Sequence, residues 1–266
     1  MGPVHPAKNL SIMNTPPHTD DLAHADIGIV YATPIELAPF FDRCERVRKY
    51  TGGDFTFRGG RYGSIRIAAV QCGMGQATAR KATHALLDAH TPKWVLSAGF
   101  AGALRPEMQV GDIVVPDVIY TTTGDKLTVD FRMESDPASR LHVGALVTAE
   151  NIVHKVVDKQ KLHIETGALA VDMESYAVAD VCRETKTRFF GVRAISDDLS
   201  ADLPPEVLSI LGGTGSLRLG AAVGALWNRP ASIKDLWRLR ELANTAAERL
   251  ATFLEGVVVQ LHEAAK

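Results

Sequence analysis

The sequence contains little cysteine, and its cysteines are not grouped. Cys44, Cys72 and Cys182 are the only three in 266 residues, and no C-x-x-C pair occurs. A sparse, odd-numbered set argues against a disulfide framework and suits a reducing compartment. The nine histidines show no metal-ligand spacing, because the terminal HEAA lacks the second histidine of a zinc helix. We therefore expect no metal and no other cofactor.

Long apolar runs and a strong net charge are also absent. No stretch reaches about 18 uninterrupted apolar residues, so we expect no membrane span. Residues 1–25 lack the apolar core of a signal peptide and are expected to form a flexible extension of a cytoplasmic protein. A formal net charge of −2 gives no strong attraction to nucleic acid or to an anionic membrane. The expected partner is a small molecule.

Nucleotide-cofactor motifs are incomplete. The stretch GMGQAT (73–78) has Gly-x-Gly, but Thr78 stands where a dinucleotide fingerprint needs its third glycine, and no Walker P-loop occurs. A nicotinamide cofactor is therefore disfavoured. Gly99 and Gly102 allow either a close approach to a ligand or a tight turn, and the sequence does not choose between these two uses.

Short apolar runs alternate with helical patterns along the chain. The strands are expected at 26–32, 64–70, 94–104, 111–120, 143–149, 167–171 and 188–196. Helices are expected after Gly75, at about 151–161, at 173–184, and from about 217 to 262 with a break near Pro230. This alternation predicts an α/β fold, a three-layer α/β/α arrangement with a twisted, mostly parallel mixed central sheet. One domain is expected over 26–266.

Carboxylates follow several of the predicted strands. Glu36, Glu174 and Asp197 each come after a strongly apolar run, where ligands bind in parallel sheets. Two carboxylates in a dry cleft can act as proton donor and proton acceptor. Each also has an ordinary explanation. Glu174 could complement a helix N-terminus, Glu36 could cap a helix starting near Ile35, and Asp197 and Asp198 could be loop acids.

Five motifs occur in order over about residues 26 to 198. They are IGIVYATPIEL, CGMGQATA, SAGFAGALRPEMQVGDIVVPD, VDMESYAVADVC and RAISDD. With them the chain resembles the purine nucleoside phosphorylase/nucleosidase superfamily, and most closely its methylthioadenosine/S-adenosylhomocysteine nucleosidase branch. The resemblance implies cleavage of a purine–ribose bond through a ribooxocarbenium-like transition state.

The resemblance also implies a role for individual residues. Asp197 matches the general acid that protonates purine N7, and Glu36 matches the acid that orients and deprotonates the attacking water. Met173 and Glu174 match the pair that holds ribose, with Glu174 accepting from the 2′- and 3′-hydroxyls. Arg193 and Ser196 resemble supports that orient Asp197. The remaining positions that match the family's substrate site are Gly75, Gly99, Phe100 and Ile152.

Two departures from the family pattern bear on the reaction. Phosphorylases of the superfamily hold phosphate with an arginine and a serine around the glycine loop. Ser97 and Phe100 stand at those places here and provide no charge-assisted phosphate binding, which favours water as the nucleophile. The nucleosidases tend to stack the base on an aromatic residue, whereas Ile152 takes that place here.

The tail is longer than a typical nucleosidase end and is similar to the hopanoid-associated branch, whose members act on nucleosides with a large lipid at the ribose 5′ carbon. Its apolar residues could line an enlarged pocket, or pack as core or as a dimer contact. The residues concerned are Leu226, Trp227, Leu236, Trp237 and Leu239.

The expected function is hydrolysis of a 5′-modified adenosine of the methylthioadenosine/S-adenosylhomocysteine type, with release of adenine. One alternative is a phosphorylase or hydrolase acting on an adenosyl-lipid. Another is a non-catalytic nucleoside-binding protein. By resemblance, we expect a homodimer.

Overall fold

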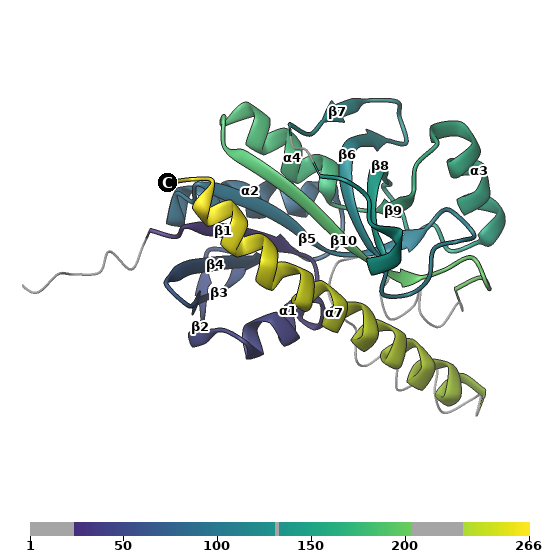
Figure 1. The fold of residues 1–266 in the computed structure, drawn as a ribbon, viewed down its shortest axis with the longest axis horizontal. Helices are drawn as coiled ribbons and strands as arrows, with labels where there is room; N and C mark the ends of the chain where they lie inside the picture. Colours follow the sequence, from purple (N-terminus) through teal and green to yellow (C-terminus); the bar gives the residue numbers. More distant parts are fainter. Residues whose placement is uncertain (1–23, 131–132, 204–230) are drawn as a thin grey trace, which may run out of the picture.

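The structure, a computed structural model, describes residues 24–130, 133–203 and 231–266, and for 231–238 it describes the backbone alone. It is an α/β fold built on one mixed, ten-stranded sheet, which confirms the expected fold class (Figure 1). The strands are β1 (Ile27–Tyr31), β2 (Glu45–Gly52), β3 (Phe55–Tyr62), β4 (Ile65–Gln71), β5 (Trp94–Ala103), β6 (Ile113–Thr121), β7 (Lys126–Thr128), β8 (Leu141–Thr148), β9 (Ala170–Asp172) and β10 (Arg188–Asp197). The helices are α1 (Pro34–Asp42), α2 (Gln76–His90), α3 (Val156–Thr166), α4 (Ser175–Glu184) and α7 (Ala231–Glu263), with a 3₁₀ turn, η1 (Pro137–Ser139).

The centre of the sheet is parallel. β4, β1, β5 and β10 lie side by side in that order and run in the same direction. Antiparallel pairings attach the β2–β3 hairpin, β7 and the short β9. Because β5 pairs with both β9 and β10, the strands β5, β10, β6, β8 and β9 close into a ring. The carboxyl ends of the central parallel strands therefore meet at one edge.

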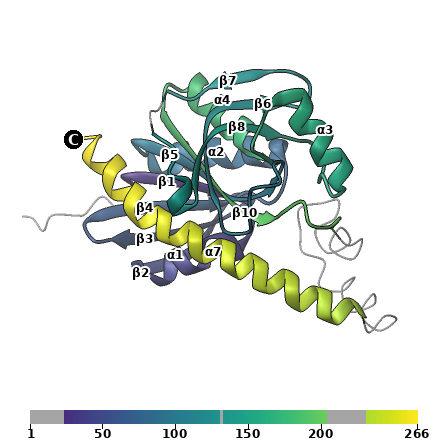
Figure 2. The same ribbon diagram turned by 45° about the vertical axis from the view of Figure 1, so that its right-hand side comes forward.

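Helices cover both faces of this sheet (Figures 1 and 2). Ile27 and Ile29 of β1 belong to a buried cluster with α1 and α7, whereas Val30 belongs to another with α2 and α4. The alternation follows from the two-residue period of a strand. Gly28 faces α2 so closely that a Cβ there would lie 2.9 Å from Leu86 Cδ2 and 2.8 Å from Pro92 Cγ.

Some elements differ from the sequence expectation. The β2–β3 hairpin was not expected, because β2 is polar and almost entirely exposed and so has no apolar run. Helix α3 begins at Val156, about one turn later than expected, and α4 begins at Ser175. Met173 and Glu174 therefore precede α4 instead of lying within it.

Helix α7 is the described part of the tail. From residue 246 onward it packs on the α1 face of the sheet. Leu226, Trp227 and residues 1–23 lie outside the described residues, as do the side chains of Leu236 and Trp237, while Leu239 is half-buried. The proposed lining of an enlarged pocket and the single domain over 26–266 stay predictions. None of the described helices is long and apolar enough to cross a membrane.

Packing of α7 gives a stability prediction. Leu254 is fully buried between α7 and the sheet, so Leu254→Ala should lower the free energy of unfolding by about 2–5 kcal/mol. The control is Val259→Ala on the same helix, where Val259 is exposed and the change should stay within about 0.5 kcal/mol. Urea unfolding measures both. Equal losses would mean that α7 does not contribute to the core as described.

Candidate active site

Glu36 lies at the end of β1, in the first turn of α1, and is 5 % exposed. Its Oε2 accepts a hydrogen bond from the Thr33 backbone N–H at 2.6 Å, which caps the helix. Its Oε1 accepts from the Phe100 N–H of β5 at 3.0 Å. The capping explanation is thus correct but incomplete, because the same carboxylate also reaches across to β5.

Glu174 precedes α4 and is 8 % exposed. It stands at the N-cap position of α4, yet its side chain does not cap that helix. Its Oε1 instead accepts from the Gly75 N–H at 2.8 Å, at the start of α2. Gly75 has φ +100, a conformation that favours glycine and turns its N–H toward the carboxylate. Glu174 is therefore fixed to a neighbouring loop, not to its own helix.

Arg193 is 2 % exposed and has a different partner from the one expected. Its guanidinium donates to Asp172 Oδ2, from Nε at 2.8 Å, and to Ser97 Oγ, from Nη2 at 2.8 Å. The expectation that Arg193 orients Asp197 is wrong. The two residues are four apart on β10, roughly 13 Å along an extended strand, so Arg193 turns to β9 and β5 instead.

Asp197 ends β10, and its side chain is 19 % exposed. The Ser196 hydroxyl donates to its Oδ1 at 2.8 Å, in agreement with the expected supporting role of Ser196. Its Oδ2 accepts from Lys159 Nζ of α3. The sequence analysis missed Lys159, and no signal pointed to it, since a lone lysine in a polar helix is normally solvated.

Two glycines of β5 make room for these side chains. A Cβ at Gly99 would lie 2.6 Å from Glu36 Oε1 and 3.2 Å from Arg193 Nη1. A Cβ at Gly102 would lie 2.9 Å from Asp197 Oδ2. Glycine at these two positions thus leaves space for the charged side chains of the site. This role differs from both expected roles, a close approach to a ligand and a tight turn.

The remaining expected site residues lie near the same edge. Ile152 follows β8 and Met173 follows β9, and these strands are parallel neighbours that end opposite each other at Thr148 and Asp172. Both Ile152 and Met173 are partly buried. Phe100 contributes its backbone N–H to Glu36, and its ring packs against the core.

Burial sets the protonation of the two glutamates. Desolvation and, next in size, the nearby Asp172 carboxylate together raise the pKa of Glu174 from 4.5 to about 8, against the opposing effect of Arg193. Burial also raises the pKa of Glu36, while the N–H groups of Thr33 and Phe100 oppose the shift. Both groups therefore hold a proton more readily than an ordinary glutamate does.

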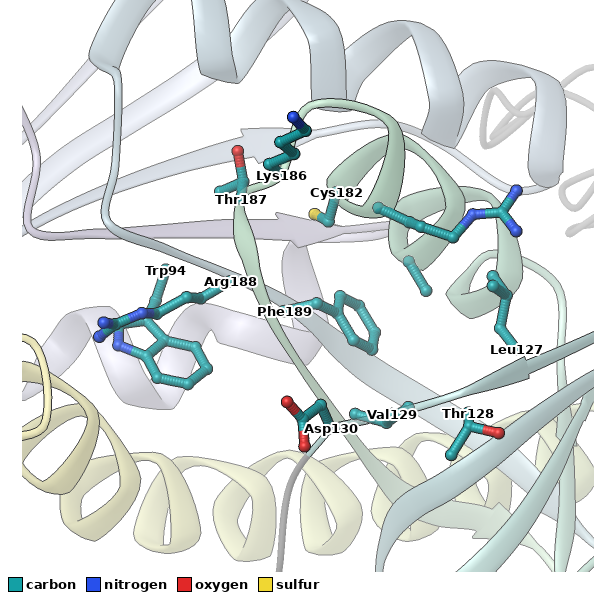
Figure 3. Close-up of a pocket in the computed structure, with 12 residues that line it drawn as sticks. Trp94, Leu127, Thr128, Val129, Asp130, Cys182, Lys186, Thr187, Arg188 and Phe189 are labelled. Carbon is teal, nitrogen blue, oxygen red and sulfur yellow. The ribbon is translucent and has the colours of Figure 1, made fainter.

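A cavity of about 320 Å³ lies elsewhere, at the starts of β5 and β10 (Figure 3). Trp94, Arg188 and Phe189 line it together with Cys182 and residues 127–130. These strand starts are at the opposite edge from Asp197, so this cavity is separate from the candidate site. Among the described residues, no group of His, Cys, Asp and Glu is arranged to hold a metal ion.

Family comparison defines the class of protein. The family model of the phosphorylase superfamily matches residues 26–138 and 133–211. Since this is more than half of the chain, the chain belongs to the phosphorylase superfamily, as its motifs suggested.

The curated relatives are more particular. The chain is similar to the 5′-methylthioadenosine/S-adenosylhomocysteine nucleosidase of Maridesulfovibrio salexigens, at 26 % identity over 203 residues, 66 % of this chain and 87 % of the relative. It is similar to the enzyme of the same name from a Marinomonas species, at 26 % identity over 221 residues, 73 % of this chain and 96 % of the relative. The expected enzyme class is the class of these relatives.

Solved structures agree on the fold. The nucleosidase of Neisseria meningitidis in complex with methylthio-immucillin-A matches with a TM-score of 0.62 and 19 % identity, over 86 % of this chain and 98 % of that chain. The futalosine hydrolase of Helicobacter pylori matches with a TM-score of 0.63 and 18 % identity, over 88 % and 97 %. Two differently named enzymes thus share this fold, and the fold alone does not select a substrate.

The raised pKa of Glu174 predicts a pH-dependent stability. Between its ordinary value of 4.5 and about 8, the folded chain holds a proton that the unfolded chain has released. This stabilising contribution is complete below pH 4.5 and is lost as the pH rises through 8. In Glu174→Gln, the free energy of unfolding should therefore fall less between pH 5 and pH 9 than in the wild type.

Urea unfolding at several pH values measures this difference. The control is Glu165→Gln on α3, whose exposed carboxylate should leave the wild-type pH dependence unchanged. An unchanged slope in Glu174→Gln would show that Glu174 titrates normally.

The close contact at Gly99 gives a second prediction. Gly99→Ala should lower the free energy of unfolding by about 1–3 kcal/mol, because its methyl group must displace Glu36 or Arg193. Gly256→Ala, on α7 with open space around it, should be neutral or stabilising. Thermal unfolding compares the two variants. A Gly99→Ala protein as stable as Gly256→Ala would contradict the described packing of Glu36.

Proposed function

We propose that this chain hydrolyses the N-glycosidic bond of a 5′-modified adenosine and releases adenine, with methylthioadenosine or S-adenosylhomocysteine as the default substrate. The observation that carries the proposal is the arrangement of Glu36, Glu174 and Asp197. Each lies at a strand end or soon after one, and each is held by specific hydrogen bonds. The similarity to nucleosidases supports the same reaction class.

Asp197 is the general acid in this proposal. Departure of adenine leaves negative charge on the base, and a proton delivered to N7 neutralises it. The Asp197 carboxyl group supplies that proton, and the Ser196 hydroxyl orients it through Oδ1. Asp197 is also the most exposed of the three acids, which suits a group that must contact the purine of the substrate.

Glu36 activates water. Its raised pKa suits a group that accepts a proton near neutral pH, because a general base works best when its pKa lies close to the working pH. The N–H groups of Thr33 and Phe100 hold both carboxylate oxygens in place. A water molecule that donates a hydrogen bond to Glu36 is held in position and can then attack the anomeric carbon as the base leaves.

Glu174 and Met173 hold the ribose. The 2′- and 3′-hydroxyls donate to Glu174, and hydrogen bonds to a carboxylate favour its charged form. Ionised Glu174 then places negative charge beside the developing ribose cation. Since the pKa of Glu174 is about 8, substrate binding at neutral pH should release a proton.

The surroundings of Ser97 support water over phosphate as the nucleophile. Ser97 is fully buried, and its hydroxyl already accepts from Arg193. Arg193 is in turn held by Asp172, so neither side chain is available to bind an anion. Ile152 offers an apolar but non-aromatic surface where the base is expected to lie. The 5′ substituent, the homodimer and the cytoplasmic location stay predictions.

The test is release of adenine from methylthioadenosine, with and without phosphate. The wild type should form adenine and the free sugar at a rate that phosphate does not change. Asp197→Asn should lower kcat by about 10² to 10⁴-fold, because the acid that protonates the leaving base is lost. Asp88→Asn, an exposed residue of α2, serves as the control and should keep wild-type activity.

Other outcomes separate the alternatives. A sugar 1-phosphate product would identify a phosphorylase. Tight binding of the nucleoside without base release over hours would identify a binding protein. Full activity in Asp197→Asn would refute the assigned acid.

A further inference from the structure

Lys159 is the one side chain of α3 that is fully buried, at 1 % exposed, and it is charged. Burying an ammonium group is costly unless a partner of opposite charge receives it. Lys159 Nζ donates to Asp197 Oδ2 and to the Asp198 carbonyl at 3.3 Å. Leu162 of the same helix packs against an apolar cluster but is only partly buried, so the most deeply buried contact of α3 is that of Lys159.

Further contacts hold Lys159 in this position. The Val156 N–H at the start of α3 donates to Asp202 Oδ1 at 2.7 Å, and the Leu203 N–H donates to the His154 carbonyl at 2.9 Å. The two bonds join the start of α3 and the residues just before it to the segment that follows Asp197. Gly102 completes the arrangement, since a Cβ there would lie 3.3 Å from Lys159 Cε.

The two oxygens of Asp197 therefore have different partners. An ammonium group has three donors and no acceptor. A proton on Asp197 Oδ2 would therefore find no acceptor in Lys159. A serine hydroxyl can donate or accept, and Ser196 Oγ also lies 3.4 Å from the Ala101 carbonyl, to which it can turn. Of the two oxygens, Oδ1, beside Ser196, is therefore the one better suited to carry a proton.

We propose that Lys159 is the positioning residue of the general acid: it holds Oδ2, leaves Oδ1 as the oxygen that carries the transferable proton, and stabilises the carboxylate that forms when the proton leaves. This inference rests on the proposed function. In the step concerned, the Oδ1–H bond breaks and an N7–H bond forms. The electron pair of the O–H bond stays on Asp197, and that of the C1′–N9 bond moves to the base.

The effect of Lys159 should depend on the leaving group. Charge develops on Asp197 only when the base takes its proton, so the ammonium helps only those substrates that need protonation. Lys159→Met keeps an unbranched side chain out to the position of Cε and removes both the charge and the donor. It should lower kcat on the adenine nucleoside by about tenfold to hundredfold, with KM changed less than about threefold.

A riboside with the same 5′ substituent and a 4-nitrophenol leaving group provides the comparison. This group departs without protonation, so Lys159→Met should change its hydrolysis less than about threefold. Lys159→Gln keeps a neutral donor to Oδ2 and should fall between Lys159→Met and the wild type. In the Asp197→Asn background, Lys159→Met should cause no further loss on the nucleoside, because the two residues act on one step.

Lys161→Met is the matched control, since Lys161 lies on the same helix with its side chain 73 % exposed. It should match the wild type on both substrates, and thermal unfolding verifies that all variants fold. Equal losses on both substrates in Lys159→Met would mean a structural role and would overturn the inference, as would no loss on either. A wild type that releases no base from any nucleoside would overturn the proposed function and this inference together.

Discussion

The buried ion pair of Arg193 and Asp172 is the interaction on which the site depends. A guanidinium that is 2 % exposed requires a charged partner, and Asp172 provides it from β9, which pairs with β5 as β10 does. The same carboxylate accepts from the Thr148 hydroxyl of β8 at 2.7 Å and from the Ser175 N–H of α4 at 2.9 Å. Arg193 also reaches Ser97 of β5. One ion pair therefore connects four strands, β5, β8, β9 and β10, with the start of the helix that Glu174 precedes.

This arrangement leaves more buried carboxylates than buried cations in its neighbourhood. Glu36, Glu174 and Asp172 all interact electrostatically with the single guanidinium of Arg193. One cation cannot neutralise three carboxylates, and burial raises the pKa values of Glu36 and Glu174 despite its attraction. A site with such an excess favours any positive charge that enters it. In the proposed reaction, that charge is the ribose cation of the transition state.

The central strands and the acids at their ends were predictable from the sequence. The β2–β3 hairpin and the partners of the buried charged groups were not, for a physical reason. The central strands are apolar runs because both of their faces are covered, so β1, β5 and β10 were recognisable. The β2–β3 hairpin packs few apolar side chains and gave no such signal. The strand-end acids were found because parallel strands align their ends. The partners of these charged groups were not found, because a contact such as Arg193–Asp172 depends on which strands are neighbours. Strand β9 reaches β5 only through the closure of the ring.

The three acids differ in the groups that hold them, and this difference suits a cycle of proton transfers. Glu36 and Glu174 accept from backbone N–H groups, which are neutral dipoles, so burial remains the dominant influence and favours the protonated form. Asp197 instead accepts from the Lys159 ammonium, which carries a full positive charge. The proposed division into a group that takes a proton from water and a group that gives one to the base thus coincides with different surroundings, neutral dipoles at Glu36 and a cation at Asp197. That division depends on α3, which delivers the only cation in direct contact with Asp197 among the described residues.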